Sequence, residues 1–258
     1  MGWKAWGAWR RPLDVDSQGE RMHIKSRHRL FLAVLAALVV AVARADAQSP
    51  ELAASFARAT TALYEMINVP DGNGIPREAL AKAHGVAVFP GVVKGAILIG
   101  GTSGDGVVTV RRQDGTWSPP AFFRMGGGSL GLQIGAEITD VVLLIMTTKG
   151  LQGLLASEFT VGADMSAAAG PTGKRAEAST DLKFTTDLVT YSRTRGLFAG
   201  LSLGGASVRA ADDWNHSLYG RGYTVREILL GTQLAIPEVA QGFIQTVVAS
   251  SGPVVGKQ

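Results

Sequence analysis

The sequence predicts an α+β fold: a glycine-rich, mainly antiparallel β-sheet, open or barrel-like, flanked by N- and C-terminal helices. Of the 258 residues, 46% are hydrophobic and 18% are charged, which provides enough apolar material for a sizeable packed core. The 33 glycines and the aromatic content of 7% favour tight turns and close-packed strands over a helical bundle. Strand-like and helix-like segments are segregated along the chain, which favours α+β over alternating α/β.

Residues 1–47 have the features of a leader that precedes the fold. A basic segment is followed by 14 uninterrupted apolar residues at 30–43, and an A-x-A cleavage pattern then ends at Ala47. This order is typical of a secretory signal peptide that is cut after Ala47. A bilayer-spanning helix needs about 20 apolar residues, so a retained anchor is the weaker interpretation. Because the basic segment directly follows Met22, we expect Met22 and not Met1 to be the true start.

The leader also carries the net charge of the protein. It holds eight of the 25 Lys and Arg and four of the 21 Asp and Glu, which leaves 17 of each in residues 48–258. The part that folds is therefore formally neutral, and we expect no nucleic-acid partner. Without cysteines it has neither disulfides nor thiolate metal sites. We predict export to the periplasm or cell envelope, and a single domain over residues 48–258 because no linker or repeat divides them.

Helical periodicity and start signals predict five helices. They lie at residues 52–67, 76–83, 148–158, 224–235 and 237–249. The first is amphipathic, with apolar residues at steps of three and four, and it follows a Ser-Pro pair that suits a helix start. Proline also stands at the first position of the second and the last helix, while Thr148 is the expected cap of the third.

Short β-rich runs lie between these helices. Turn sequences at 101–106 and 113–116 separate the first runs into consecutive hairpins. Residues 132–138 alternate apolar and polar side chains, which is typical of a half-buried strand. Residues 141–146 continue as a strand that is buried on both faces, and 182–192 form a later strand.

The stretch RMGGGSLGLQIGAE at residues 124–137 matches two well-known signatures. Gly126, Gly128 and Gly131 have the spacing of a dinucleotide fingerprint, and Ser129 stands in a G-x-S-x-G serine-hydrolase pattern. Both signatures require a helix directly after the motif, whereas the following residues alternate with the period of a strand. We therefore interpret the glycines as places where a strand bends and another backbone approaches closely.

Residues suited to catalysis or metal binding are sparse. His84 and His216 are the histidines that follow the leader, so Ser129 or Ser202 with His216 and an acid such as Asp187 is a remote serine-hydrolase alternative. Two separated histidines without cysteines do not form a zinc set. We predict that the protein is not an enzyme and holds no cofactor or metal.

Seven basic residues lie in or beside glycine-rich turns and are candidates for binding lipid or phosphate groups. They are Lys94, Arg124, Lys149, Lys174, Arg175, Arg193 and Arg195. A cluster of such residues holds phosphate through bidentate Arg contacts and backbone N–H groups. The alternative is that they are scattered solvated charges, balanced by the 17 acidic residues.

Seven sequence blocks follow one another over residues 75–220. They are Ile75-Pro76, AKAHGVAVFPGVVKGAILIGG, Trp117-Ser118-Pro119-Pro120, GGGSLGLQIGAE, GADMSAAAGPTGKRAEA, YSRTRGLFAGLSLGGA and Asn215 ahead of Tyr219-Gly220. In this order they resemble the SYLF domain, a lipid-binding module found in bacteria and eukaryotes. The resemblance implies binding and not catalysis. The basic positions that it carries over are Lys94, Lys174, Arg175, Arg193 and Arg195.

The resemblance also bears on partners, because eukaryotic SYLF proteins are associated with phosphoinositide membranes and with actin assembly, often through an attached SH3 or FYVE module. Only 38 residues follow Gly220, and FYVE needs cysteines, so we expect a phospholipid or membrane surface and not actin. The sequence thus predicts a non-enzymatic lipid-binding or membrane-associating domain of an exported bacterial protein. The alternative is an envelope assembly protein whose glycine-rich edge strands pair with another chain.

Overall fold

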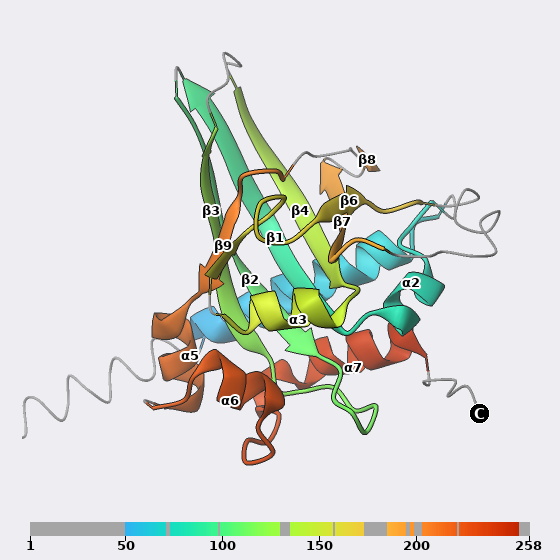
Figure 1. Ribbon diagram of the computed structural model, residues 1–258, viewed down its shortest axis with the longest axis vertical. Helices are drawn as coiled ribbons and strands as arrows, with labels where there is room; N and C mark the ends of the chain where they lie inside the picture. The colour runs from blue at the N-terminus through green and yellow to red at the C-terminus, as the bar shows by residue number, and fades with distance from the viewer. Residues whose placement is uncertain are drawn as a thin grey trace, which may run out of the picture. The chain divides into compact units, whose positions relative to one another are not determined.

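A curled β-sheet is the centre of the fold (Figure 1). In this computed structural model its strands are β1 (Gly85–Ile97), β2 (Ile99–Val110), β3 (Ala121–Ser129), β4 (Gly135–Ile145), β5 (Glu158–Thr160), β6 (Ala167–Ala169), β7 (Leu188–Thr194), β8 (Leu197–Phe198) and β9 (Ser207–Ala210). The described strands follow the order β5-β9-β3-β2-β1-β4-β7-β6, and β8 pairs with β7. All pairs are antiparallel except β6 with β7. The predicted class, α+β with a mainly antiparallel sheet, is confirmed, and the sheet has the form of a half-barrel.

The structure describes residues 50–70, 73–97, 99–129, 135–156, 158–172, 185–194, 197–198, 203–220 and 222–252. The predicted leader lies outside these residues. Residues from Pro50 onward form one compact unit, to which all the described residues belong.

The turn predicted at 101–106 is wrong, whereas the turn at 113–116 is confirmed. Residues 101–106 lie inside β2 and all pair with β3 on one side, and residues 101–103 also pair with β1 on the other. A Cβ on Gly106 would lie 2.3 Å from Cδ1 of Phe89, and one on Gly104 would lie 2.8 Å from Cγ2 of Val92. These glycines therefore make room for side chains of β1, next to the bulge in that strand, and do not reverse the chain.

Three helices cover one face of the sheet. They are the N-terminal helix (residues 50–67), α2 (Arg77–Lys82) and α7 (Gln241–Ser251), which follows the short helix η1 (Glu238–Ala240). The ring of Phe56 in the N-terminal helix lies 5.1 Å from that of Phe122 in β3 and 6.4 Å from that of Phe243 in α7. The N-terminal helix and α7 therefore share one apolar core with the sheet (Figure 1). The predicted amphipathic helix is confirmed.

Two further helices, α3 (Thr148–Leu154) and α6 (Val225–Leu230), contribute to a second core on the opposite face. In β4 the side chains alternate between the two cores, with Val142 in the first and Val141 and Leu143 in the second. This alternation between two covered faces explains why residues 141–146 are apolar without interruption, as the sequence predicted.

The helices differ from the prediction at several points, and among them α3 ends at Leu154 and not at 158, and α7 spans Gln241–Ser251 and not 237–249. The helix α5 (Asp212–Tyr219) was not predicted. Thr147, and not Thr148, caps α3, because its Oγ1 accepts a hydrogen bond of 2.9 Å from the backbone N–H of Gly150. The helix α6 ends at Leu230, several residues before its predicted end.

Candidate functional site

The described members of the predicted basic set do not meet at one place. Three of the seven residues, Lys174, Arg175 and Arg195, lie outside the described residues. Arg124 lies in β3 and Arg193 in β7, and the strands β2, β1 and β4 lie between them. At about 4.8 Å for each strand spacing, roughly 19 Å separates the two strands. One phosphate group therefore does not contact both arginines.

Arg124 is held by acidic residues from two other elements. Its Nε donates a hydrogen bond of 2.7 Å to Oδ1 of Asp105, the residue opposite it in β2. Its Nη2 lies 3.4 Å from Oδ2 of Asp213 in α5. The hydrogen bond to Asp105 raises the pKa of the Arg124 guanidinium above its ordinary value. The charge of Arg124 is thus compensated within the fold.

Arg193 connects three elements of the structure. Its Nη2 pairs with Oε2 of Glu65 in the N-terminal helix and lies 3.6 Å from Oδ2 of Asp140, the residue opposite it in β4. Asp140 also accepts a hydrogen bond of 2.9 Å from the backbone N–H of Gly91, in the bulge of β1. Only 14% of the Arg193 side chain is exposed. This geometry fixes the N-terminal helix to the sheet.

Lys149 lies at the edge of a hydrogen-bond network around Asp187. Its Nζ is 3.5 Å from Oδ2 of Asp187, which is itself buried. Thr147 donates a hydrogen bond of 2.7 Å to Oδ1, and the backbone and hydroxyl of Ser166 donate bonds of 3.0 and 2.8 Å to Oδ2. The bond from Thr147, supported by those from Ser166 and by the charge of Lys149, lowers the pKa of Asp187 from about 3.8 to about 2. Phosphate binding by any of the seven residues stays a prediction.

The glycine stretch does not form a phosphate loop or a nucleophile elbow in its described part. Gly126 and Gly127 lie inside β3, and the chain is again a strand from the start of β4. A Cβ on Gly127 would lie 3.2 Å from Cα of Ala206, so the predicted close approach of a second backbone is confirmed. Ser129 ends β3, whereas Ser202 lies outside the described residues.

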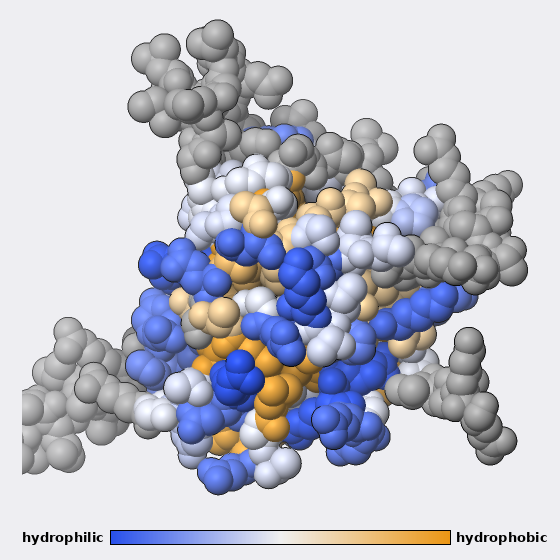
Figure 2. All heavy atoms as spheres, in the orientation of Figure 1, coloured by the Kyte–Doolittle hydropathy of each residue, from blue (hydrophilic) through white to orange (hydrophobic). Residues whose placement is uncertain are grey.

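The described residues were searched for metal sites and membrane spans. They contain no group of three or more His, Asp or Glu side chains with the geometry of a metal site. No helix among them is both long and apolar enough to cross a bilayer. On the face that carries α3 and α6, a small apolar area is bounded by hydrophilic residues (Figure 2).

Two apolar side chains are exposed at one end of the sheet. Val93 in β1 is 45% exposed, and Ile138, opposite it in β4, is 65% exposed. The backbone of Lys94, the fourth described member of the basic set, follows directly and pairs with Glu137. We call this group of residues, 93–94 and 137–138, the sheet end. It contains an exposed apolar pair and, next to it in the register, a basic residue paired with an acidic one.

Two residues of the last SYLF-like block fix α5 to the sheet. The side-chain amide of Asn215 accepts a hydrogen bond of 2.7 Å from the backbone N–H of Phe122 and donates one of 3.0 Å to the carbonyl of the same residue. The hydroxyl of Tyr219 donates a hydrogen bond of 2.6 Å to the carbonyl of Pro120. Asn215 and Tyr219 therefore have a structural role, because they join α5 to β3 and to the segment before it.

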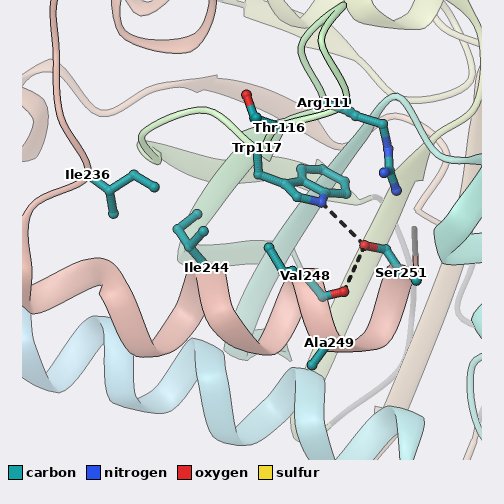
Figure 3. Close-up of a pocket in the computed structure, with 10 residues that line it drawn as sticks. Arg111, Thr116, Trp117, Ile236, Ile244, Val248, Ala249 and Ser251 are labelled. Atoms are coloured by element: carbon teal, nitrogen blue, oxygen red, sulfur yellow. Dashed lines mark hydrogen bonds between the residues drawn. The ribbon is translucent and has the colours of Figure 1, made fainter. Parts of the chain in front are cut away.

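A cavity of about 680 Å³ lies between α7, the turn after β2 and the segment before η1 (Figure 3). Its lining residues are Arg111, Gly115, Thr116, Trp117, Ile236, Ile244, Val248, Ala249, Ser251 and Gly252. We call it the Trp117 pocket. The guanidinium carbon of Arg111 lies 4.6 Å from the centre of the indole ring of Trp117, within the range of a cation–π contact.

Arg111 is not among the seven basic residues predicted from the sequence. Those residues lie in or beside glycine-rich turns, whereas Arg111 precedes the turn 113–116 and is paired with Trp117 across it. The available signal was the basic residue and the aromatic residue that flank this predicted turn, because hairpin geometry places such residues opposite each other.

Comparisons with known proteins identify relatives of this chain. Residues 126–250 match the family model described as "Ysc84: Las17-binding protein actin regulator". The SH3 domain-containing protein PJ696.02 of Schizosaccharomyces pombe is 37% identical over 169 residues, which are 64% of this chain and 39% of the relative. Protein YSC84 of Saccharomyces cerevisiae is 34% identical over 176 residues, 66% of this chain and 37% of the relative.

A human relative is also similar. The SH3 domain-containing YSC84-like protein 1 of Homo sapiens is 31% identical over 179 residues, which are 67% of this chain and 52% of the relative. The chain thus spans between about two fifths and one half of the length of these curated relatives.

Proposed function

We propose that this chain, a homologue of the Ysc84 proteins that carries a Ysc84/SYLF-type domain, is a non-enzymatic domain that binds phospholipid at a membrane surface. The description of the family names binding and regulation and not a reaction. The protein-binding activity that it names, toward Las17, belongs to relatives of which this chain matches only a part.

The sheet end is the observation that carries the proposal. Val93 and Ile138 expose apolar surface side by side, and transfer of such surface out of water is favourable by about 25 cal/mol per Å². Lys94 follows Val93 in the sequence and is paired in register with Glu137, so an anionic membrane surface would attract the first and repel the second. An exposed apolar pair of this kind is suited to contact with the acyl chains at a membrane interface.

Vesicle flotation of the full chain tests the proposal. We expect the chain to float with vesicles of phosphatidylcholine that contain an anionic phospholipid, and to float less with phosphatidylcholine alone. Replacement of the apolar pair in a Val93→Thr/Ile138→Gln variant is expected to weaken partitioning roughly thirtyfold, since each of the two side chains contributes about 1 kcal/mol.

Two controls keep this experiment interpretable. Val239→Thr changes an exposed apolar residue of η1, away from the sheet end, and should float like the wild type. A peptide of residues 1–47 measures how far the leader alone binds the same vesicles. Equal flotation of the double variant and the wild type would exclude the sheet end, and no flotation beyond that of the peptide would defeat the proposed function.

The exposed edge of the sheet supports a second candidate function, assembly with another envelope protein. In the described order β6 is the last strand, and its three alanines are exposed. An exposed edge offers unpaired backbone groups to another strand. Light scattering after size exclusion, followed by cross-linking in cells, tests this function, and a strict monomer without cross-linked partners would rule it out.

The remaining alternative, a serine hydrolase that uses Ser129 or Ser202, is tested with a fluorophosphonate probe. We expect neither serine to be labelled. Labelling of either one would make the protein an enzyme.

Export of the protein is part of the same proposal. The A-x-A pattern that ends at Ala47 supports a periplasmic or envelope protein. N-terminal sequencing of the protein purified from its own cells should give Gln48 as the first residue. A protein that keeps residues 30–43 would instead be anchored by them.

A further inference from the structure

The Trp117 pocket lies outside the sheet end, and its walls are mostly apolar. On α7 the side chains of Ile244 and Val248 face the indole of Trp117, and Ile236 lies across from them (Figure 3). Val248 is 50% exposed, so the pocket is open to solvent on that side. A volume of about 680 Å³ lies within the range of small-molecule sites, about 300 to 1,000 Å³.

Arg111 is the charged residue of the lining, and it lacks an acidic partner among the described residues. The ion pairs of those residues involve Arg124, Lys149 and Arg193, and none of them includes Arg111. Its hydrogen bonds go to the carbonyls of Ala83 and Leu80 at the end of α2, and both are long at 3.4 Å. Partial burial of the Arg111 side chain lowers the pKa of its guanidinium.

The hydroxyl and indole N–H groups of the lining already have partners. Oγ1 of Thr116 donates to the carboxylate of Asp114 at 2.6 Å. The indole N–H of Trp117 donates to Oγ of Ser251 at 3.3 Å, and that hydroxyl donates to the carbonyl of Val248 at 3.4 Å. Arg111 is therefore the side chain of the lining with donors to spare for a ligand. No acidic residue is part of the lining, so the pocket favours an anion over a cation.

We propose that the Trp117 pocket binds a long-chain fatty acid, with the carboxylate against Arg111 and the acyl chain along Trp117, Ile244 and Val248. A guanidinium matches a carboxylate through two parallel hydrogen bonds, and the apolar wall excludes water from the chain. One charged anchor beside an extended apolar wall fits an amphiphile with a single anionic head. This site does not depend on the binding of membranes by the sheet end.

The test uses a fatty acid that reports contact with the indole. A terminally brominated dodecanoic acid, kept below its micelle concentration, is titrated into the full chain while tryptophan fluorescence is followed, because bromine quenches indole on contact. We expect saturable quenching, binding about tenfold tighter for the acid than for the corresponding brominated alcohol, and a gain of about fourfold for each added methylene.

Two variants and two matched controls identify the site. Arg111→Gln should abolish the preference for the acid over the alcohol. Val248→Asp should lower the affinity for both probes by about tenfold, because it places a charge at the rim of the pocket. Arg226→Gln, at an exposed position of α6, and Val239→Asp should bind like the wild type.

Three results would overturn the proposal. The first is an Arg111→Gln variant that still prefers the acid, and the second is a Val248→Asp variant that binds as tightly as the wild type. The third is binding that requires removal of residues 253–258, which would mean that the chain's own end fills the pocket. Flotation of these variants with anionic vesicles separates this proposal from the proposed function. A protein that floats normally but binds no fatty acid would contradict only the pocket proposal. A protein that binds fatty acid but does not float would contradict only the proposed membrane binding.

Discussion

Arg193 and Arg111 are both partly buried arginines, yet the structure surrounds them differently. Arg193 lies beside Glu65 and Asp140 and joins a helix to the sheet. Arg111 stacks on Trp117 in an apolar pocket and has no described acidic partner. A basic residue in a family block, such as Arg193, can thus have its charge fully compensated within the fold. A basic residue outside such a block can be the one that is left for a ligand.

Removal of Arg193 is expected to have the largest effect on stability among the charged groups. Arg193→Met leaves Asp140 and Glu65 without their partner, and we expect the free energy of unfolding to fall by about 2 kcal/mol. Urea denaturation measures this loss, and Arg226→Met is the exposed control, with an expected change below about 0.5 kcal/mol. An equally small loss for Arg193→Met would show that Arg193 is not a structural residue and would remove the contrast with Arg111.

The hydrogen-bond network around Asp187 is also structural, and the stability that it provides should depend on pH. The pKa of Asp187 is lower in the fold, about 2, than its ordinary value of 3.8. Its contribution to stability is therefore complete above the ordinary value and is lost as the pH falls toward 2. We expect Asp187→Asn to lower the free energy of unfolding by about 1 to 2 kcal/mol at pH 7. The free energies of unfolding of the wild type and of the Asp187→Asn variant should become similar near pH 2. A difference between them that does not change with pH would contradict this account.

Replacement of Arg124 should lower the free energy of unfolding by less than replacement of Arg193, because Arg124 is more exposed. About a third of its side chain, and of that of Asp105, is accessible to solvent. We expect Arg124→Gln to lower the free energy of unfolding by about 1 kcal/mol in low salt and by less at high ionic strength. Urea denaturation at two salt concentrations checks this, and a loss that is independent of salt would argue against an electrostatic origin.

Arg111 is expected to contribute least to stability. The long hydrogen bonds to Leu80 and Ala83 and the contact with Trp117 are offset by the burial of an unpaired charge. We expect Arg111→Gln to change the free energy of unfolding by less than about 0.5 kcal/mol and to remove the stabilisation that added dodecanoate gives the wild type. Thermal unfolding with and without dodecanoate measures both. A large loss without ligand would make Arg111 a structural residue like Arg193.

The sequence predicted those parts of the fold that depend on local pattern. The helix over residues 50–67 follows from its apolar period, and the strand at 141–146 from its unbroken apolar run. The glycines at 101–106 were misread as a turn, because their reason lies in the neighbouring strand, where Phe89 and Val92 need space. Similarly, the role of Asn215 in fixing α5 depends on a segment 93 residues away.

The candidate sites were less predictable than the fold. Three basic residues of the predicted set are described with their side chains, and each contacts acidic residues that the sequence places far from it, as Arg193 contacts Glu65. Whether a charge is compensated depends on such distant pairs. For Arg111 the sequence offers only its pairing with Trp117 across the turn, since the helix α7 meets these two residues only in the folded chain.

Lipid analysis of the full-length protein, purified from its own cells without detergent, tests the central claim most directly, because it asks whether the domain binds lipid at all. The account predicts a co-purified anionic lipid, with fatty acid present at about one molecule per chain in the wild type and absent from the Arg111→Gln variant. A wild-type protein that carries no lipid, and takes up none when vesicles are added, would contradict it.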